Sequence, residues 1–143
     1  MDRTIEARYN SIKIKMEVNK IKLEKIDHVS IYVRDLEKAR RFFAELLDAE
    51  FSDVSQDKEL DTRGSMGPAG IELIAPLTPD GPVARAIDKR GEGLSLVSLK
   101  VPNLEQAVAE MQSRGVRLAA KIEHLAVFHP KDTYGVMFEF IEK

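Results

Sequence analysis

The sequence predicts an α+β fold in which two β-α-β-β-β halves pack against each other as a pair. A chain of 143 residues, with 43% hydrophobic and 32% charged residues, fits one globular domain. A strand-like and helix-like pattern that begins near residue 26 is echoed 68 residues later. A half of about 50 residues with one short helix would bury little apolar surface alone, so we expect the halves to share a core.

The two segments that open the halves, residues 26–39 and 94–107, each predict one strand followed by one helix. Asp35 and Asn103 occupy N-cap positions, and apolar residues follow them at helical spacing. The segments share six identical pairs: Val29/Val97, Ser30/Ser98, Val33/Val101, Leu36/Leu104, Glu37/Glu105 and Ala39/Ala107.

Short strands are expected after each helix, near residues 50–55, 59–66 and 70–75 in the first half and 116–121, 124–129 and 136–141 in the second. The turn signals Gly67-Pro68 and Tyr134-Gly135 precede the last strand of each half. Between the halves, a short helix is expected to begin near Pro82 and to end near Gly91.

We divide the chain into an N-terminal extension, residues 1–22, and a single domain, residues 23–143. The domain consists of module one (23–77), a connector (78–92) and module two (93–143). In the extension, Ile12, Ile14, Met16 and Val18 alternate with charged residues. This period of two predicts an additional strand at a sheet edge or against a partner.

Composition and charge exclude several classes of function. The chain has no cysteine, which excludes disulfides, zinc thiolates and thiol catalysis. A formal net charge of −2 gives no broad attraction to nucleic acid or to anionic membranes. No apolar run approaches the roughly 20 residues that span a bilayer, and the N-terminus lacks the apolar core of a signal peptide. We therefore expect a cytoplasmic protein with a small-molecule partner.

Three side chains are candidates for a metal site. Glu72 and Glu139 occupy the same place in the closing strands of the two halves. A carboxylate on a buried face is costly unless it is paired, protonated or bound to metal, although alternation also allows both to face solvent. His28 lies in the opening strand, and its counterpart in the repeat is Leu96. One imidazole and two carboxylates suit a divalent cation with open positions, although a lone histidine can also be structural.

Several stretches of the sequence resemble those of a known family. The opening resembles that of the vicinal-oxygen-chelate superfamily, which has the glyoxalase/bleomycin-resistance fold, in Asp27-His28-Val29, Asp35-Leu36-Glu37-Lys38-Ala39 and Phe42-Phe43. Further stretches are similar to its methylmalonyl-CoA epimerase branch: residues 71–77, residues 90–94, and residues 128–132 with Gly135, Val136 and Glu139. The resemblance runs from about Ile26 to Ile141.

The resemblance implies a curved, barrel-like mixed sheet with the helices outside. It implies a divalent metal cofactor (Co, Mn, Ni, Mg or Zn) whose ligands occupy the positions of His28, Glu72, Leu96 and Glu139. The third position departs from the family, which has histidine there. A second departure follows Val116, where the family has a longer loop.

The activity that the resemblance implies is a metal-dependent epimerase of methylmalonyl-CoA or a related acyl-CoA. Such an enzyme removes the α proton through a metal-stabilised enolate. Glu139 is expected to be both ligand and base, and Asp61 is a candidate for the opposite base or else a surface aspartate paired with Arg63. Arg63 and Lys131 are candidates for binding a substrate carboxylate or a CoA phosphate. The resemblance also implies a homodimer.

Two other functions stay open. The shortened loop before His124 favours a glyoxalase-like lyase or isomerase of the same superfamily with a smaller chelating substrate. Leu96 favours a non-catalytic ligand-binding protein, because a lost imidazole weakens metal affinity.

Overall fold

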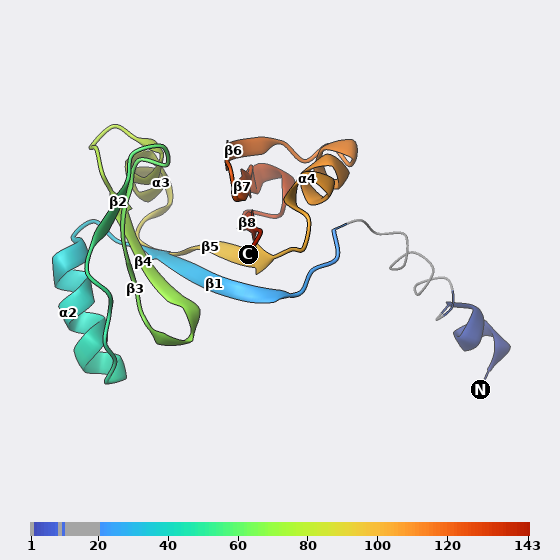
Figure 1. The fold of residues 1–143 in the computed structure, drawn as a ribbon, viewed down its shortest axis with the longest axis horizontal. Coiled ribbons are helices and arrows are strands. Elements are labelled where there is room, and N and C mark those ends of the chain that lie inside the picture. Colours follow the sequence, from blue (N-terminus) through green and yellow to red (C-terminus); the bar gives the residue numbers. More distant parts are fainter. Residues whose placement is uncertain (1, 9, 11–20) are drawn as a thin grey trace.

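The structure, a computed structural model, describes residues 2–8, 10 and 21–143 and shows one eight-stranded mixed sheet (Figure 1). Its spatial order is β2-β3-β4-β1-β5-β8-β7-β6. The elements are β1 (Lys25–Tyr32), α2 (Leu36–Leu47), β2 (Ser55–Asp57), β3 (Thr62–Met66), β4 (Ile71–Pro76), α3 (Pro82–Arg90), β5 (Gly93–Lys100), α4 (Leu104–Ser113), β6 (Leu118–Ile122), β7 (Leu125–Phe128) and β8 (Met137–Ile141). The prediction of two β-α-β-β-β halves is confirmed. The strand predicted from Ile12 to Val18 lies outside the described residues.

The two halves join through their opening strands. β1 pairs antiparallel with β5, and each opening strand also pairs in parallel with the closing strand of its own half, β1 with β4 and β5 with β8. In this register Ser30 lies beside Glu72, and Ser98 lies beside Glu139. The repeat in the sequence therefore becomes an approximate two-fold relation centred on β1 and β5.

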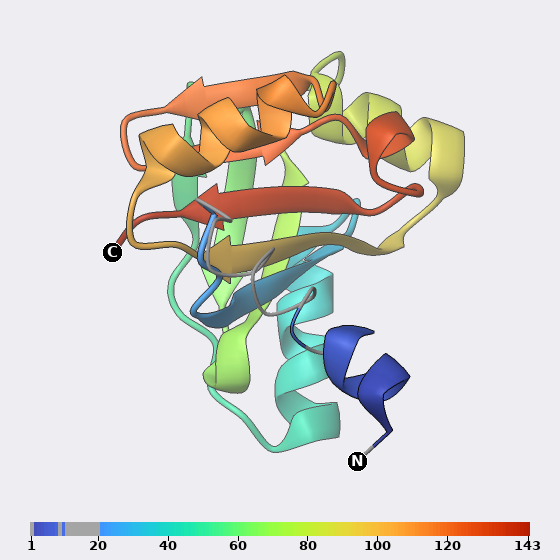
Figure 2. The same ribbon diagram turned by 90° about the vertical axis from the view of Figure 1, so that its right-hand side faces the viewer.

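The sheet curls so that its two ends face each other, with β1 and β5 running between them (Figure 1). Figure 2 shows β8, β5 and β1 side by side. α2 and α4 lie outside this curve, whereas α3 packs with Val83 and Ile87 against Tyr32 of β1, on the side of the site described below. None of the described helices is long and apolar enough to cross a membrane. The site described below lies on the concave face of the sheet.

Each half has its own apolar core between its main helix and the convex side of the sheet. In the first half Leu36 packs with Val33, Leu73 and Ala75. The core of the second half contains Val101, Leu104, Ala107, Val108, Ala126, Phe128 and Phe140. The predicted helix starts are confirmed, because side chains of the cap residues accept backbone hydrogen bonds, Asp35 from Lys38 (3.1 Å) and Asn103 from Gln106 (3.0 Å).

Two strand boundaries differ from the prediction. The strand expected at residues 50–55 is β2, which begins only at Ser55, and the strand expected at 59–66 begins at Thr62. Phe51 and Val54 do pack against the first core, but from a loop. Their apolar side chains indicate burial, and the sequence pattern did not distinguish a buried loop from a paired strand.

Candidate active site

A cavity of about 310 Å³ lies on the concave side of the sheet, and both halves line it. Its polar lining comes from Ser30, Tyr32, Glu59, Thr62, Glu72 and Glu139, and most of the remaining lining is aliphatic. This volume is at the small end for ligand sites, which suits an acyl group better than a whole coenzyme. A larger hollow of about 580 Å³ lies between the end of β1 and α2, away from the two strand glutamates.

The two glutamates are held by matching serines. Ser30 Oγ donates a hydrogen bond to Glu72 Oε1, and Ser98 Oγ donates one to Glu139 Oε1, each at 2.7 Å. Glu139 is only 6% exposed, so it faces the interior and not the solvent. Its neighbour Phe140 is also buried, because α4 covers the other face of β8. Both faces of this strand are therefore enclosed.

His28 connects the two carboxylates. Its Nε2 lies 3.6 Å from Glu72 Oε1 and 3.5 Å from Glu139 Oε1, and its Nδ1 lies 2.8 Å from Asp27 Oδ2. Lys143 Nζ also contacts Asp27, at 3.0 Å. Asp27 thereby fixes the orientation of the ring and directs Nε2 into the space between the glutamates.

The electrostatics of this cluster favour Glu139 as a proton acceptor. Burial raises the pKa of Glu139, and the charges of Glu72 and Asp27 add to that effect, whereas Ser98 and His28 oppose it. Burial also acts to raise the pKa of Asp27, but hydrogen bonds from His28 and Lys143 outweigh it and leave that pKa below its usual value. A carboxylate with a raised pKa is better matched to proton abstraction near neutral pH.

The donor types of this cluster fit a divalent ion. One imidazole nitrogen lies within 3.6 Å of two carboxylate oxygens, whereas neighbouring ligands about 2.1 Å from an ion are separated by roughly 3.0–3.4 Å. Among the described residues, however, no group of three or more histidine, aspartate or glutamate side chains is already arranged as a metal site. Leu96, at the position of a fourth ligand, is buried, lines the cavity and offers no donor atom.

The other predicted site residues lie elsewhere. Asp61 has a positive φ of 57° in the turn between β2 and β3, and its Oδ2 accepts a hydrogen bond from Thr78 Oγ1 at 2.6 Å. Arg63 forms an ion pair with Glu37 of α2, so the alternative pairing of Asp61 with Arg63 is not found. Lys131 is exposed in the short turn Pro130–Asp132. Of these residues none lines the cavity.

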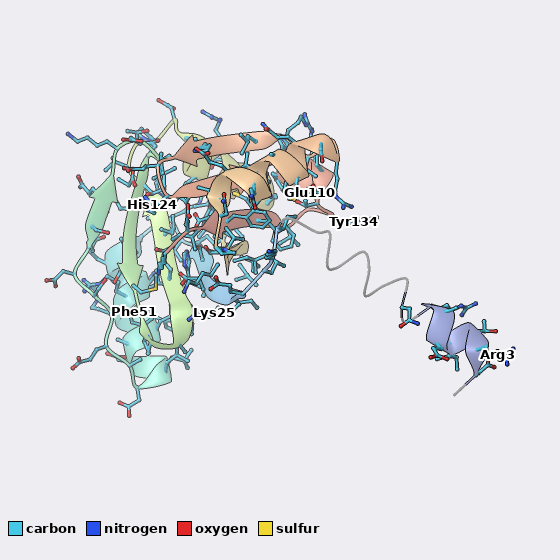
Figure 3. The ribbon with its side chains drawn as sticks, turned by 45° about the vertical axis from the view of Figure 1, so that its right-hand side comes forward. Arg3, Lys25, Phe51, Glu110, His124 and Tyr134 are labelled. Carbon is cyan, nitrogen blue, oxygen red and sulfur yellow. The ribbon has the colours of Figure 1, made fainter. Side chains whose placement is uncertain are left out.

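Sequence reasoning did not assign a role to several residues that line the cavity or hold its carboxylates. Ser30 and Ser98 were already visible as a repeated identity between apolar residues, and Tyr32 follows His28 and Ser30 on one face of β1. Those spacings could have identified all three. Glu59 had no such signal, because it reaches the cavity from a turn. His124, labelled in Figure 3, is exposed in the turn between β6 and β7.

Comparison with known proteins identifies the family. The model of the Glyoxalase/Bleomycin resistance protein/Dioxygenase superfamily matches residues 27–129. The chain belongs to this superfamily. Two mitochondrial methylmalonyl-CoA epimerases are similar to it over 82% of its length: the mouse enzyme at 30% identity, with 72% of that protein covered, and the bovine enzyme at 32%, with 73% covered.

Solved structures agree with this assignment. The methylmalonyl-CoA epimerase of Mycobacterium tuberculosis superposes with a TM-score of 0.74 at 27% identity, over 87% of this chain and 90% of that one. A Streptomyces coelicolor methylmalonyl-CoA epimerase in complex with 2-nitronate-propionyl-CoA has a TM-score of 0.75 at 24% identity, over 85% of this chain and 98% of that one. The second likeness supports the fold alone.

Proposed function

We propose that this protein epimerises methylmalonyl-CoA or a related acyl-CoA by exchanging the proton α to the thioester. The observation that carries the proposal is the buried carboxylate of Glu139, which lines a cavity of acyl size and has a raised pKa. The epimerases among the relatives supply the substrate class.

The reaction requires proton transfer on two faces of one carbon. A carboxylate takes the α proton, and the electron pair of the C–H bond becomes the C=C bond of an enolate whose negative charge lies on the thioester oxygen. Return of a proton to the opposite face inverts the centre, so a second proton-transfer group must lie across the substrate. Glu139 on β8 takes the first role.

The second role falls to Glu59 in place of Asp61. Glu59 lines the cavity from the turn between β2 and β3. The next residue, Leu60, packs against the buried cluster Leu125, Val127 and Ile141 of the other half, and its backbone N–H donates to Asp57 Oδ1 at 3.0 Å. The turn is thus anchored at its tip. Asp61 supports it from the far side through its hydrogen bond with Thr78.

His28, Glu72 and Glu139 are the residues that would hold a divalent ion, with cobalt, manganese, nickel, magnesium or zinc as candidates. Such an ion would supply Lewis acidity toward the thioester oxygen, an effect of several kcal/mol. Asp27 keeps the imidazole oriented, and the two serines keep one oxygen of each carboxylate in place. Elemental analysis of protein purified without chelators tests this assignment, and a stoichiometric divalent ion that His28→Ala removes is the expected result.

The coenzyme portion lies outside the cavity in this proposal. Lys131 is its candidate phosphate contact, because it is exposed and forms no ion pair with any described carboxylate. Arg63 is the weaker candidate, since Glu37 already neutralises its charge. The homodimer is also part of the proposal, and Ile26 and Leu94 on the central strands, 62% and 66% exposed, are apolar surface that a second copy would cover. Light scattering at several concentrations tests the dimer.

Conversion of a single epimer tests the proposed activity. Incubation of one epimer of methylmalonyl-CoA with the protein, with each candidate ion added in turn, should produce the other epimer. The nitronate compound bound to the S. coelicolor relative, an analogue of the enolate, should compete with the substrate. Absence of conversion with every ion, in protein that is folded by circular dichroism, contradicts the proposal.

Leu96 favours one alternative, a non-catalytic acyl-CoA-binding protein, because it replaces a donor inside the cavity with an alkyl group. Such a protein would bind the nitronate analogue and the substrate with similar affinity and convert neither epimer. A glyoxalase-like activity would instead appear in a screen of hemithioacetals and 2-oxo compounds.

A further inference from the structure

The hydroxyl of Tyr32 is a hydrogen-bond donor inside the cavity, and the acceptor that it contacts is a weak one. Its side chain lies on the same face of β1 as His28 and Ser30, since alternate residues of a strand share a face. Tyr32 is 6% exposed, and its hydroxyl donates to Met137 Sδ at 3.7 Å across the intervening strand β5. A thioether is a weak acceptor, so little is lost when this hydroxyl turns to another partner.

The surroundings keep this hydroxyl protonated. Burial raises the pKa of Tyr32 to about 12, Arg90 acts in the opposite direction, and the charges of Glu139 and Glu72 contribute to the rise. At neutral pH the group is therefore a hydrogen-bond donor and neither an acid nor a base. Tyr32, Glu72 and Glu139 all line the same cavity, so the phenol shares the site with the carboxylate proposed to take the α proton.

The two serine hydroxyls beside the carboxylates already donate hydrogen bonds. The hydroxyls of Ser30 and Ser98 each donate to a glutamate at 2.7 Å. Thr62 is the remaining hydroxyl of the lining, and it comes from β3, near the edge of the sheet. Tyr32 therefore combines burial, a retained proton and a weakly used hydrogen bond.

We propose that Tyr32 donates a hydrogen bond to the thioester oxygen of the substrate and holds that oxygen as the enolate charge develops on it. This inference rests on the proposed function. The phenol keeps its own proton throughout, and only its acceptor changes, from the sulfur of Met137 to the substrate oxygen. A fixed donor in a site with little water stabilises a developing oxyanion more than it stabilises the neutral ground state.

Tyr32→Phe removes the hydroxyl and leaves the ring, which packs against Val83 and Ile87, in place. Tyr134→Phe is the matched control, because it makes the same change at a fully exposed tyrosine that does not line the cavity. We expect Tyr32→Phe to lower kcat for epimer conversion by about 100-fold with little change in KM, as for loss of one oxyanion donor. Tyr134→Phe should stay within about threefold of the wild type, a change too small for loss of such a donor.

Binding of two ligands provides the readout that a structural role would not move. The nitronate analogue carries the charge of the enolate, whereas propionyl-CoA has a neutral thioester. Tyr32→Phe should weaken binding of the nitronate by about the same factor as kcat and leave propionyl-CoA binding unchanged. Wild-type kcat and nitronate affinity in Tyr32→Phe, or an equal loss for both ligands, would overturn the assignment. A wild-type protein that converts no epimer overturns the proposed function instead.

Discussion

The two halves of the molecule carry the same serine–glutamate pair and differ in what surrounds it. Ser30 and Glu72 in the first half, and Ser98 and Glu139 in the second, occupy matching registers and form hydrogen bonds of the same length, 2.7 Å. Yet the imidazole of His28 has an alkyl group, Leu96, as its counterpart. The duplicated scaffold thus supplies two matching carboxylates. The difference between His28 in one half and Leu96 in the other makes the two sides of the site unlike.

Burial separates the two carboxylates further. The side chain of Glu139 is 8% exposed and that of Glu72 is 23% exposed. Desolvation disfavours the charged form of a carboxyl group, so burial raises the pKa of Glu139 even though the hydrogen bond from Ser98 opposes the rise. Under the proposed function, this difference favours Glu139 over Glu72 as the base, and variants of the paired residues test that asymmetry.

The largest expected effect comes from the two glutamates. Glu139→Gln should lower kcat for epimer conversion by about 10³-fold, within the range for loss of a general base. Glu72→Gln keeps an oxygen atom beside His28 that can ligate a metal. It should lower kcat only about tenfold, since the site loses a charge but keeps Glu139 as its proton acceptor. Steady-state kinetics on both variants, compared at saturating metal, measure the difference. Equal losses in the two variants would remove the asymmetry from the account.

Exchange of the imidazole and its alkyl counterpart should act on metal affinity. His28→Leu makes the two halves alike and should weaken binding of a divalent ion by about 100-fold or more. Leu96→His adds a second imidazole on the opposite side and should strengthen binding by about tenfold. Calorimetric titration of the metal-free variants with manganese or cobalt gives both values. If Leu96→His binds no more tightly than the wild type, the position of Leu96 does not face the metal.

The serines should affect stability to different degrees. Ser98→Ala removes a hydrogen bond to a buried carboxylate and should cost about 1–3 kcal/mol of unfolding free energy. Ser30→Ala should cost less, because water can reach Glu72 more easily. Urea unfolding at pH 7 compares the two. A larger loss in Ser30→Ala would reverse the ranking by burial.

The smallest expected effect concerns a surface ion pair. Arg117 holds Asp132 through two side-chain contacts and a backbone hydrogen bond, which lower the pKa of Asp132 to about 2. A lowered pKa in the folded state gives stability that is present above the unfolded value, 3.8, and is lost as the pH falls toward 2. The Tm difference between wild type and Asp132→Asn should therefore shrink between pH 4 and pH 2. A constant difference would show that the ion pair does not contribute through its charge.

Much of the fold was predictable because the signals that mark its strands and helices are local and occur twice. Strand and helix periodicity, together with the N-caps Asp35 and Asn103, located the halves and the starts of their helices. The sequence also paired Glu72 with Glu139 and singled out His28, since these positions follow from the register of the strands. Residues whose partners are set by packing between elements, and not by strand register, were not predictable in this way. The turn that carries Glu59 and Asp61 is fixed by contacts of Leu60 with the other half, and Arg63 pairs with a glutamate of α2.

Hydrogen–deuterium exchange at the α carbon is the most direct measurement of the central claim. In deuterated water with a bound divalent ion, the wild-type protein should replace the α hydrogen of methylmalonyl-CoA with deuterium, as seen by NMR or mass spectrometry. Glu139→Gln should incorporate deuterium about 10³-fold more slowly, as expected when the general base is removed. Exchange at the wild-type rate in Glu139→Gln, or no exchange by the wild type with any divalent ion, would contradict the account.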